Sequence, residues 1–174
     1  TSGDVLTAAS STNYNFGFVN CCLEMWVRIH DNDVSSGNWL AAHTDNSTPN
    51  TGALGLYLSG SHFTGRATVA SGGGSDGEVT ITTSGYTING SQRYHVALVK
   101  NGNTYTIYVD GVSRGSTSGT YGASNYPTGD QPFSIFALKG GTAGCQCWID
   151  NFRLSNTARY TSGFTPHTSA HSND

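Results

Sequence analysis

Charged residues are scarce in this sequence of 174 residues. Only 11% of its residues are Asp, Glu, Lys or Arg, where about 25% is usual. Lys occurs only at Lys100 and Lys139, Glu only at Glu24 and Glu78, and Met only once. All three are good helix formers. Gly, Ser, Thr and Asn, which suit turns and loops better than helices, supply nearly half of the chain. A helical bundle is therefore excluded.

Positive charge is scarce as well. Eight Lys and Arg residues stand against eleven Asp and Glu, which leaves a net charge of −3. The basic residues are scattered and form no patch for phosphate groups, so we expect no nucleic-acid partner. No apolar run approaches the roughly 18 residues of a membrane-spanning helix, so we expect no membrane span.

Aromatic residues, by contrast, are well represented, with three Trp, nine Tyr and seven Phe. They supply a core that a disordered chain would lack. No repeat, charge block or proline-rich linker divides the sequence, which predicts a single domain over residues 1–174. The chain opens at Thr1 and shows no signal peptide, so we expect a processed form, an excised domain, or a chain whose first residues are missing.

Apolar residues alternate with polar ones in short segments that are separated by turn residues, a pattern typical of strands. From Cys21 to Ile29 the odd-numbered residues are expected on one face, and Cys22, Glu24, Trp26 and Arg28 on the other. The predicted strands are Phe18–Ile29, Leu54–Leu58, Phe63–Val69, Glu78–Thr83, Tyr94–Lys100, Thr104–Asp110, Phe133–Leu138 and Cys147–Leu154. Turns at Ser59-Gly60-Ser61 and Asn101-Gly102-Asn103 predict hairpins. The fold class is therefore all-β, a two-sheet antiparallel sandwich.

Three blocks of sequence carry a family resemblance. They are Cys22–Val27, with Glu-x-Trp-Val; Tyr94–Gly111, with an aromatic-His-Val-Ala strand, a turn and Tyr-Val-Asp-Gly; and Trp148–Leu154, with Ile-Asp-x-x-Arg. In this order and spacing they resemble laminin G-like (concanavalin A-like) domains, which implies a jelly-roll sandwich. The segment Asn156–Pro166 is similar to the tail of such domains in bacteriophage structural proteins. This fold hosts lectins, glycosidases, receptors and capsid parts, so the resemblance leaves the function open.

An enzyme is not expected. Glucanases on this fold use paired carboxylates in a Glu-x-Asp-x-x-Glu strand, and neither Glu24 nor Glu78 has an acidic residue two positions later. The Gly-x-Ser-x-Gly sequence of Ser hydrolases occurs at Gly73–Gly77 and at Gly111–Gly115, but the catalytic elbow needs a strand-to-helix turn and no helix is predicted.

Cys21, Cys22, Cys145 and Cys147 form two groups. The family resemblance implies that the first and last strands are neighbours, so we expect the two groups to meet in one or two disulfides. The alternative is that some are buried free thiols.

The acidic cluster Asp31-Asn32-Asp33 could hold calcium through its carboxylates and the backbone carbonyls around it. Family members often bind calcium at the rim of the sandwich, which supports this prediction for Asp31 and Asp33. The same sequence is also ordinary turn chemistry.

Candidate ligand-binding residues are aromatic side chains that could stack on sugars and polar ones that could bind hydroxyls. The segment Gly115–Asp130 is expected to be a long loop, which favours a binding role. The candidates are Tyr121, Asn125 and Tyr126 in that loop, and Trp39, His43, Tyr57, His62 and Arg66 elsewhere. Core packing of Trp39 and Tyr57 is the alternative.

Together these patterns predict a non-enzymatic adhesion module that recognises glycans of a host or cell surface. We expect it outside cells or on a virion, as part of a tail fibre or as a capsid decoration. Two alternatives remain open: a purely structural decoration protein that contacts other virion subunits, and a secreted lectin-like domain.

Overall fold

The computed structural model describes residues 5–9, 20–30, 37–43, 54–70, 76–119, 132–137 and 143–171, although for 68–70 and 76–79 only the backbone is described. Every regular element within these ranges is a β-strand. The strands are β1 (Leu6–Ala8), β2 (Cys21–Ile29), β3 (Trp39–His43), β4 (Leu54–Ser59), β5 (His62–Ala70), β6 (Asp76–Thr82), β7 (Arg93–Asn101), β8 (Thr104–Val109), β9 (Val112–Ser118), β10 (Phe133–Ile135) and β11 (Cys147–Ser155). Within the described ranges, no helix has the length and hydropathy needed to cross a bilayer.

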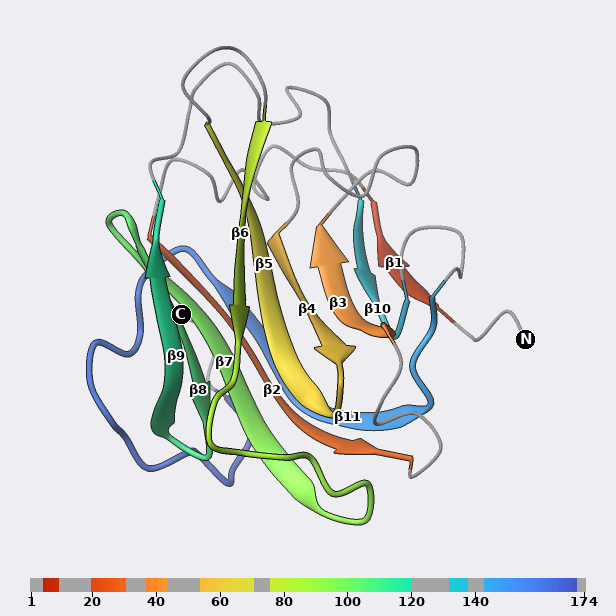
Figure 1. Cartoon of the computed structure of the whole chain (residues 1–174). Coiled ribbons are helices and arrows are strands. Elements are labelled where there is room, and N and C mark those ends of the chain that lie inside the picture. Colours follow the sequence, from red (N-terminus) through yellow and green to blue (C-terminus); the bar gives the residue numbers. More distant parts are fainter. Residues whose placement is uncertain are drawn as a thin grey trace.

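The strands form two antiparallel sheets that pack face to face (Figure 1). One sheet has six strands in the order β1-β10-β3-β4-β5-β6, and the other has five in the order β11-β2-β7-β8-β9. The predicted two-sheet sandwich is therefore confirmed.

Alternation along β2 determines which of its side chains face the core and which face outward. Cys21, Leu23, Met25, Val27 and Ile29 are at most 1% exposed and point into the core between the sheets. The residues between them point to the opposite face, as expected for a strand. Gly65 on β5 lets the sheets approach closely, because an added Cβ would lie 2.7 Å from Leu98 Cδ1 in the facing sheet.

Local turn chemistry fixes the register of the predicted hairpins. Gly60 and Ser61 both have positive φ, 55° and 63°, and join β4 to β5, as a two-residue hairpin turn requires. Gly102, with φ of 59°, begins the turn between β7 and β8. Both predicted hairpins are confirmed.

Three strands were not predicted, each for a reason of its own. In β3 all five residues are buried, and β1 has only three residues. The polar strand β9 lies at the edge of its sheet and extends to Ser118. Gly115–Ser118 is therefore strand rather than the start of a loop. The strand predicted over Phe133–Leu138 ends at Ile135, where Phe136 adopts a φ of 75°.

Candidate functional site

The outer face of the five-stranded sheet has a covered half and an open half. Residues 156–171 follow β11 and run outside this sheet (Figure 1). Side chains from this segment, which we call the C-terminal strap, cover Cys22 and its neighbours on β7 and β8. Further along β2, Trp26 is half-buried and Arg28 is exposed. The open half is therefore the part of this face that a ligand could reach.

A buried carboxylate anchors the strap. The Glu24 side chain is fully buried and accepts hydrogen bonds from Arg153 Nε at 2.7 Å and from the Tyr160 hydroxyl at 2.7 Å. A second nitrogen of Arg153 lies 2.6 Å from the same carboxylate, and His95 Nε2 lies 3.2 Å from it. These contacts tie β2, β7 and β11 to the strap.

The same contacts determine the ionisation of Glu24. Burial by itself would raise the pKa of this carboxyl, but the hydrogen bonds from His95, Tyr160 and Arg153, with the charge of Arg153, outweigh it and lower the pKa to about 2. Burial and the hydrogen bond to Glu24 raise the pKa of Tyr160. Glu24 is thus an ionised structural group that a ligand cannot reach.

Aromatic packing holds the rest of the strap. The rings of Tyr160 and Phe164 are stacked, with centroids 3.5 Å apart and planes 5° apart. Both rings meet Tyr108 of β8 edge-on, with centroids 6.4 and 5.5 Å away. The strap is a fixed border of the open half.

A β-bulge in β11 puts two charged side chains on the outer face. Asp150 and Arg153 are three residues apart, so they would point to opposite faces of a regular strand. Asp150 is paired with Trp26 and Arg153 with Glu24, and the register shifts between them, where Asn151 has a φ of 49°. The extra residue turns both charged groups outward.

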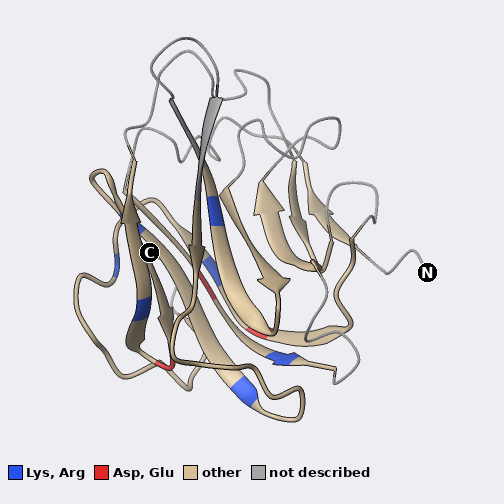
Figure 2. Ribbon diagram, in the orientation of Figure 1, with Lys and Arg blue, Asp and Glu red and all other residues tan. Residues whose placement is uncertain are grey.

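Two rows of cross-strand partners line the open half. Arg28 is flanked by Trp148 on β11 and Arg93 on β7, and Trp26 is paired with Asp150. Basic residues on β2 and β7 and an acidic one on β11 are visible near this end of the sheet (Figure 2). Together with Val27 these residues line a cleft of about 250 Å³, which we call the Trp148 groove.

Charge and aromatic contacts hold the groove residues in place. The guanidinium carbon of Arg93 lies 4.5 Å from the Trp26 ring centroid, and Arg93 forms an ion pair of 2.9 Å with Asp150. The guanidinium carbon of Arg28 lies 5.2 Å from the Trp148 ring centroid. Trp26 donates its indole N–H to the carbonyl oxygen of His167 in the strap, at 2.7 Å. The groove is therefore bordered by residues with defined positions.

The chemistry of the groove suits a ligand with both apolar and polar faces. Trp148 is 60% exposed, which is unusual for so large an aromatic side chain. Its ring offers an apolar surface, while Arg28, Arg93 and Asp150 supply charged donors and acceptors at the same place. A sugar has C–H groups on one face and hydroxyls around its edge, so it matches this combination.

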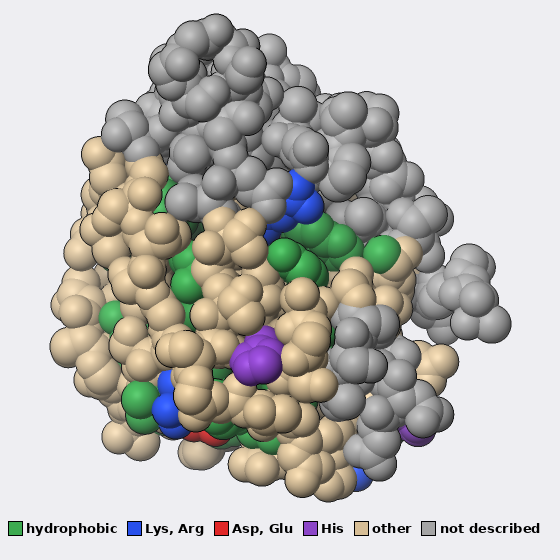
Figure 3. All heavy atoms as spheres, viewed as in Figure 1, with side chains coloured by type: hydrophobic (Ala, Val, Ile, Leu, Met, Phe, Trp, Pro, Cys, Tyr) green, Lys and Arg blue, Asp and Glu red, His purple; other side chains and the backbone are tan. Residues whose placement is uncertain are grey.

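The structure brings three of the predicted ligand residues to the outer face of the six-stranded sheet. Trp39 is paired with Tyr57, their ring centroids lie 4.9 Å apart, and Arg66 stands two residues further along this face, paired with Gly55. Hydrophobic and basic side chains lie side by side on the visible face of the molecule (Figure 3). Trp39, however, is only 5% exposed. It therefore packs within the protein and cannot offer a ring face to a ligand, which corrects the expectation for this residue.

His43 also departs from the prediction. It is 1% exposed and is paired with Leu54 and Phe133, both of which belong to the core. Since directly paired residues in antiparallel strands share a face, His43 points inward and is not a ligand-binding residue.

His62 begins β5, where its Nδ1 lies near the Gly60 carbonyl oxygen. The remaining predicted ligand and calcium residues lie outside the described ranges. These are Tyr121, Asn125 and Tyr126, proposed for ligand, and Asp31 and Asp33, proposed for calcium. Within those ranges, no cluster of three or more His, Cys, Asp or Glu side chains is placed to hold a metal ion.

The predicted disulfides are not formed, because all four cysteines are free thiols. β2 and β11 are indeed neighbours, but they run antiparallel, with Cys22 opposite Ser155 and Cys147 opposite Ile29. At about 3.4 Å per residue, Cys22 and Cys147 are on the order of 24 Å apart, and a disulfide needs Cα atoms within about 7 Å. Burial raises the pKa of Cys21 to about 12.

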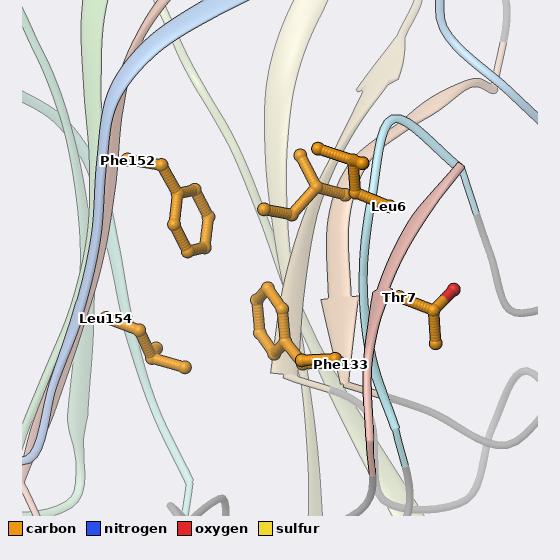
Figure 4. A pocket seen from close by; sticks show the side chains of 7 residues that line it. Leu6, Thr7, Phe133, Phe152 and Leu154 are labelled. Carbon is orange, nitrogen blue, oxygen red and sulfur yellow. The ribbon is translucent and has the colours of Figure 1, made fainter. Parts of the chain in front are cut away.

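A second cavity, of about 380 Å³, lies between the sheets. Phe152 and Leu154 of β11 face Leu6 and Phe133 across it (Figure 4). Thr7 is the one polar residue in its lining, and its side chain points away from the cavity (Figure 4), so the cavity offers little to bind the hydroxyls of a sugar. We therefore assign the Trp148 groove as the candidate site.

The groove residues escaped prediction because they come from three strands. The outward position of Trp26 and Arg28 was predicted by the alternation of β2. Only the pairing with β7 and β11 places Arg93, Trp148 and Asp150 beside them. The one local signal is Trp148 itself, an aromatic residue at an outward position of an edge strand.

The family model Laminin_G_3, described as the concanavalin A-like lectin/glucanases superfamily, matches residues 2–162. The chain belongs to this superfamily. The predicted resemblance to laminin G-like domains is thereby confirmed. No curated protein sequence is significantly similar to the chain.

Several solved structures share the concanavalin A-like fold at low sequence identity. The binding domain of Paraclostridial Mosquitocidal Protein 1 has a TM-score of 0.65 and 18% identity, over 90% of this chain and 39% of that one. A Bacteroides ovatus protein assigned to carbohydrate binding has a TM-score of 0.61 and 16% identity, over 91% and 43%. The binding domain of Botulinum Neurotoxin DC in complex with SialylT has a TM-score of 0.58 and 14% identity, over 91% and 38%. This chain spans about two-fifths of the length of these proteins.

Proposed function

We propose that this domain is a non-enzymatic carbohydrate-binding module and that the Trp148 groove holds the sugar. The observation that carries the proposal is the 60% exposed Trp148 ring in a cleft that also holds Arg28, Arg93 and Asp150. A sugar stacked on Trp148 would place its hydroxyls within reach of these charged side chains.

The similar solved structures support carbohydrate binding in general rather than the position of the groove. One is a toxin binding domain in complex with SialylT, and another is a protein assigned to carbohydrate binding. Among the acidic residues whose side chains are described, Glu24 is fully buried, Asp110 accepts the backbone N–H of His95, and Asp150 forms an ion pair with Arg93. None of the three is placed as a free general acid, and we propose binding without catalysis.

We further propose that the module is displayed outside cells, on a virion, as part of a tail fibre or as a capsid decoration. The support is the sequence of the Ala158–Pro166 segment, which resembles the tail of laminin G-like domains in bacteriophage structural proteins. It forms the strap beside the groove, so the same segment would also shape the binding surface.

The test is a glycan array probed with the wild-type chain, Trp148→Ala and Trp148→Phe. We expect the wild type to bind, Trp148→Ala to lose about 10-fold or more in affinity, and Trp148→Phe to keep most of it, because Phe preserves an aromatic platform. Since Trp148 is exposed, both variants should melt at the wild-type temperature. Wild-type binding that Trp148→Ala leaves unchanged would contradict the groove assignment, and a wild type that binds no glycan would contradict the function.

The same glycan array tests the predicted calcium site and the predicted ligand residues near Tyr126. We propose a calcium ion at Asp31 and Asp33, so binding should weaken in chelator and in Asp31→Asn. Binding that survives chelation speaks against that ion. Tyr126→Ala is compared with Trp148→Ala, because a loss confined to Tyr126→Ala would move the sugar site to the segment that holds Tyr121 and Asn125.

A further inference from the structure

Two arginines lie directly opposite one another in the Trp148 groove. Arg28 on β2 and Arg93 on β7 are cross-strand partners, and both point to the outer face of the sheet. Like charges in directly opposite positions destabilise an antiparallel pair of strands. The pairing is therefore a local departure from what stability favours, and such departures gather at functional sites.

Among the described residues, only one of the two charges has a carboxylate partner. Asp150 lies 2.9 Å from Arg93, and its Oδ1 also accepts the backbone N–H of Asn151 at 2.8 Å. Arg28 has no carboxylate partner in the same part of the chain. The described lining of the groove thus carries two guanidinium groups and one carboxylate.

Arg28 is also held in a defined position. Its guanidinium carbon lies 5.2 Å from the Trp148 ring centroid, a cation–π contact that limits the rotamers of a long side chain. Stacking on a ring uses the face of the guanidinium and leaves its N–H edge for a ligand. That edge presents parallel donors in the plane that a carboxylate requires.

We propose that the groove binds a saccharide that carries a carboxylate group, with this carboxylate on the N–H edge of Arg28 and the sugar ring against Trp148. The inference rests on the proposed function and names its ligand class. The anion would add a second negative charge beside Arg28 and Arg93. A polyanion such as nucleic acid is disfavoured, because the chain has a net charge of −3 and the described lining of the groove holds only two arginines, one of them paired with Asp150.

The experiment compares each carboxylated glycan with its own methyl ester, which removes the charge and changes little else. Sialyllactose, trigalacturonic acid and a glucuronic acid disaccharide are presented with their esters to the wild-type chain. We expect at least one acid to bind about 10- to 100-fold more tightly than its ester, the range of a charge-assisted hydrogen bond. Arg28→Gln should bind both forms equally weakly, and Arg28→Lys should lie between it and the wild type.

Arg114→Gln is the matched control, with the same change in charge on β9, at the opposite edge of the sheet from β11. It should bind as the wild type does. Equal wild-type binding of acid and ester, or acid binding that Arg28→Gln leaves intact, would overturn the carboxylate inference. In that case the proposed function is still supported if the wild type binds neutral glycans and Trp148→Ala does not. Failure of every acidic and neutral glycan to bind would overturn both.

Discussion

Gly111 and Phe164 meet backbone to backbone: the Phe164 N–H donates to the Gly111 carbonyl oxygen at 3.0 Å. Gly111 lies in the turn between β8 and β9, and Phe164 lies in the C-terminal strap. A Cβ on Gly111 would overlap the Phe164 carbonyl oxygen, and the φ of 77° at Gly111 favours glycine. A single glycine thus lets the strap reach the sheet.

Gly111→Ala should therefore loosen the strap as well as strain the turn. We expect a loss of about 2–4 kcal/mol in the free energy of unfolding in urea, with faster proteolysis near Arg159. Gly102→Ala is the control, because its φ is 59° but nothing lies within 4 Å of the added Cβ. It should lose only about 1 kcal/mol and leave the strap protected. Equal effects of the two variants would contradict the close contact.

The buried Glu24 should make the stability depend on acidic pH. Its pKa is about 2 in the folded chain, below the ordinary value of 4.5, so the folded state stabilises the ionised form. The resulting stability, about 3 kcal/mol, is complete above pH 4.5 and is lost as the pH falls toward 2. Urea unfolding measured at steps across this range would show the loss.

Glu24→Gln should remove this part of the pH dependence. It should also destabilise the chain at pH 7 by about 3–5 kcal/mol, because Arg153 would lose the carboxylate that compensates its charge. If the free energy of unfolding of the variant still falls with pH as it does in the wild type, a group other than Glu24 causes the pH dependence.

Truncation of Phe152, which lines the cavity between the sheets, should destabilise the fold. The ring centroid of Phe152 lies 5.6 Å from that of Phe133, so Phe152→Ala removes this contact and enlarges the cavity. We expect a loss of about 2–4 kcal/mol in the free energy of unfolding. Leu6→Ala, at a residue that is 62% exposed, should lose less than about 1 kcal/mol. A smaller loss at Phe152 than at Leu6 would contradict this arrangement.

The thiols should react according to their burial. Cys21 is fully buried with a raised pKa, and Cys147 is half-buried. Brief iodoacetamide treatment of the folded chain at pH 8 should therefore label Cys147 before Cys21. After unfolding without reductant, mass spectrometry should find all four cysteines labelled. Two unlabelled cysteines would indicate a disulfide.

Local sequence was enough to determine most strands, the hairpin turns and the inward and outward faces of β2. Strand alternation and positive-φ turn residues act over two to four residues, so they can be read without knowing the fold. The Gly60-Ser61 turn is an example, with φ values of 55° and 63°. The family resemblance then supplied the jelly-roll sandwich.

Tertiary structure decided where distant residues meet. The alternation of apolar and polar residues along a strand does not determine which strands are neighbours or where a bulge occurs. The antiparallel register of β2 and β11 separates the cysteines that were expected to pair, and the bulge after Asp150 turns both Asp150 and Arg153 outward. The register of β2 with β11 and with β7 places Arg28 between Trp148 and Arg93, and these residues form the groove. The sequence determined which residues could bind, and long-range strand pairing decided which of them lie together.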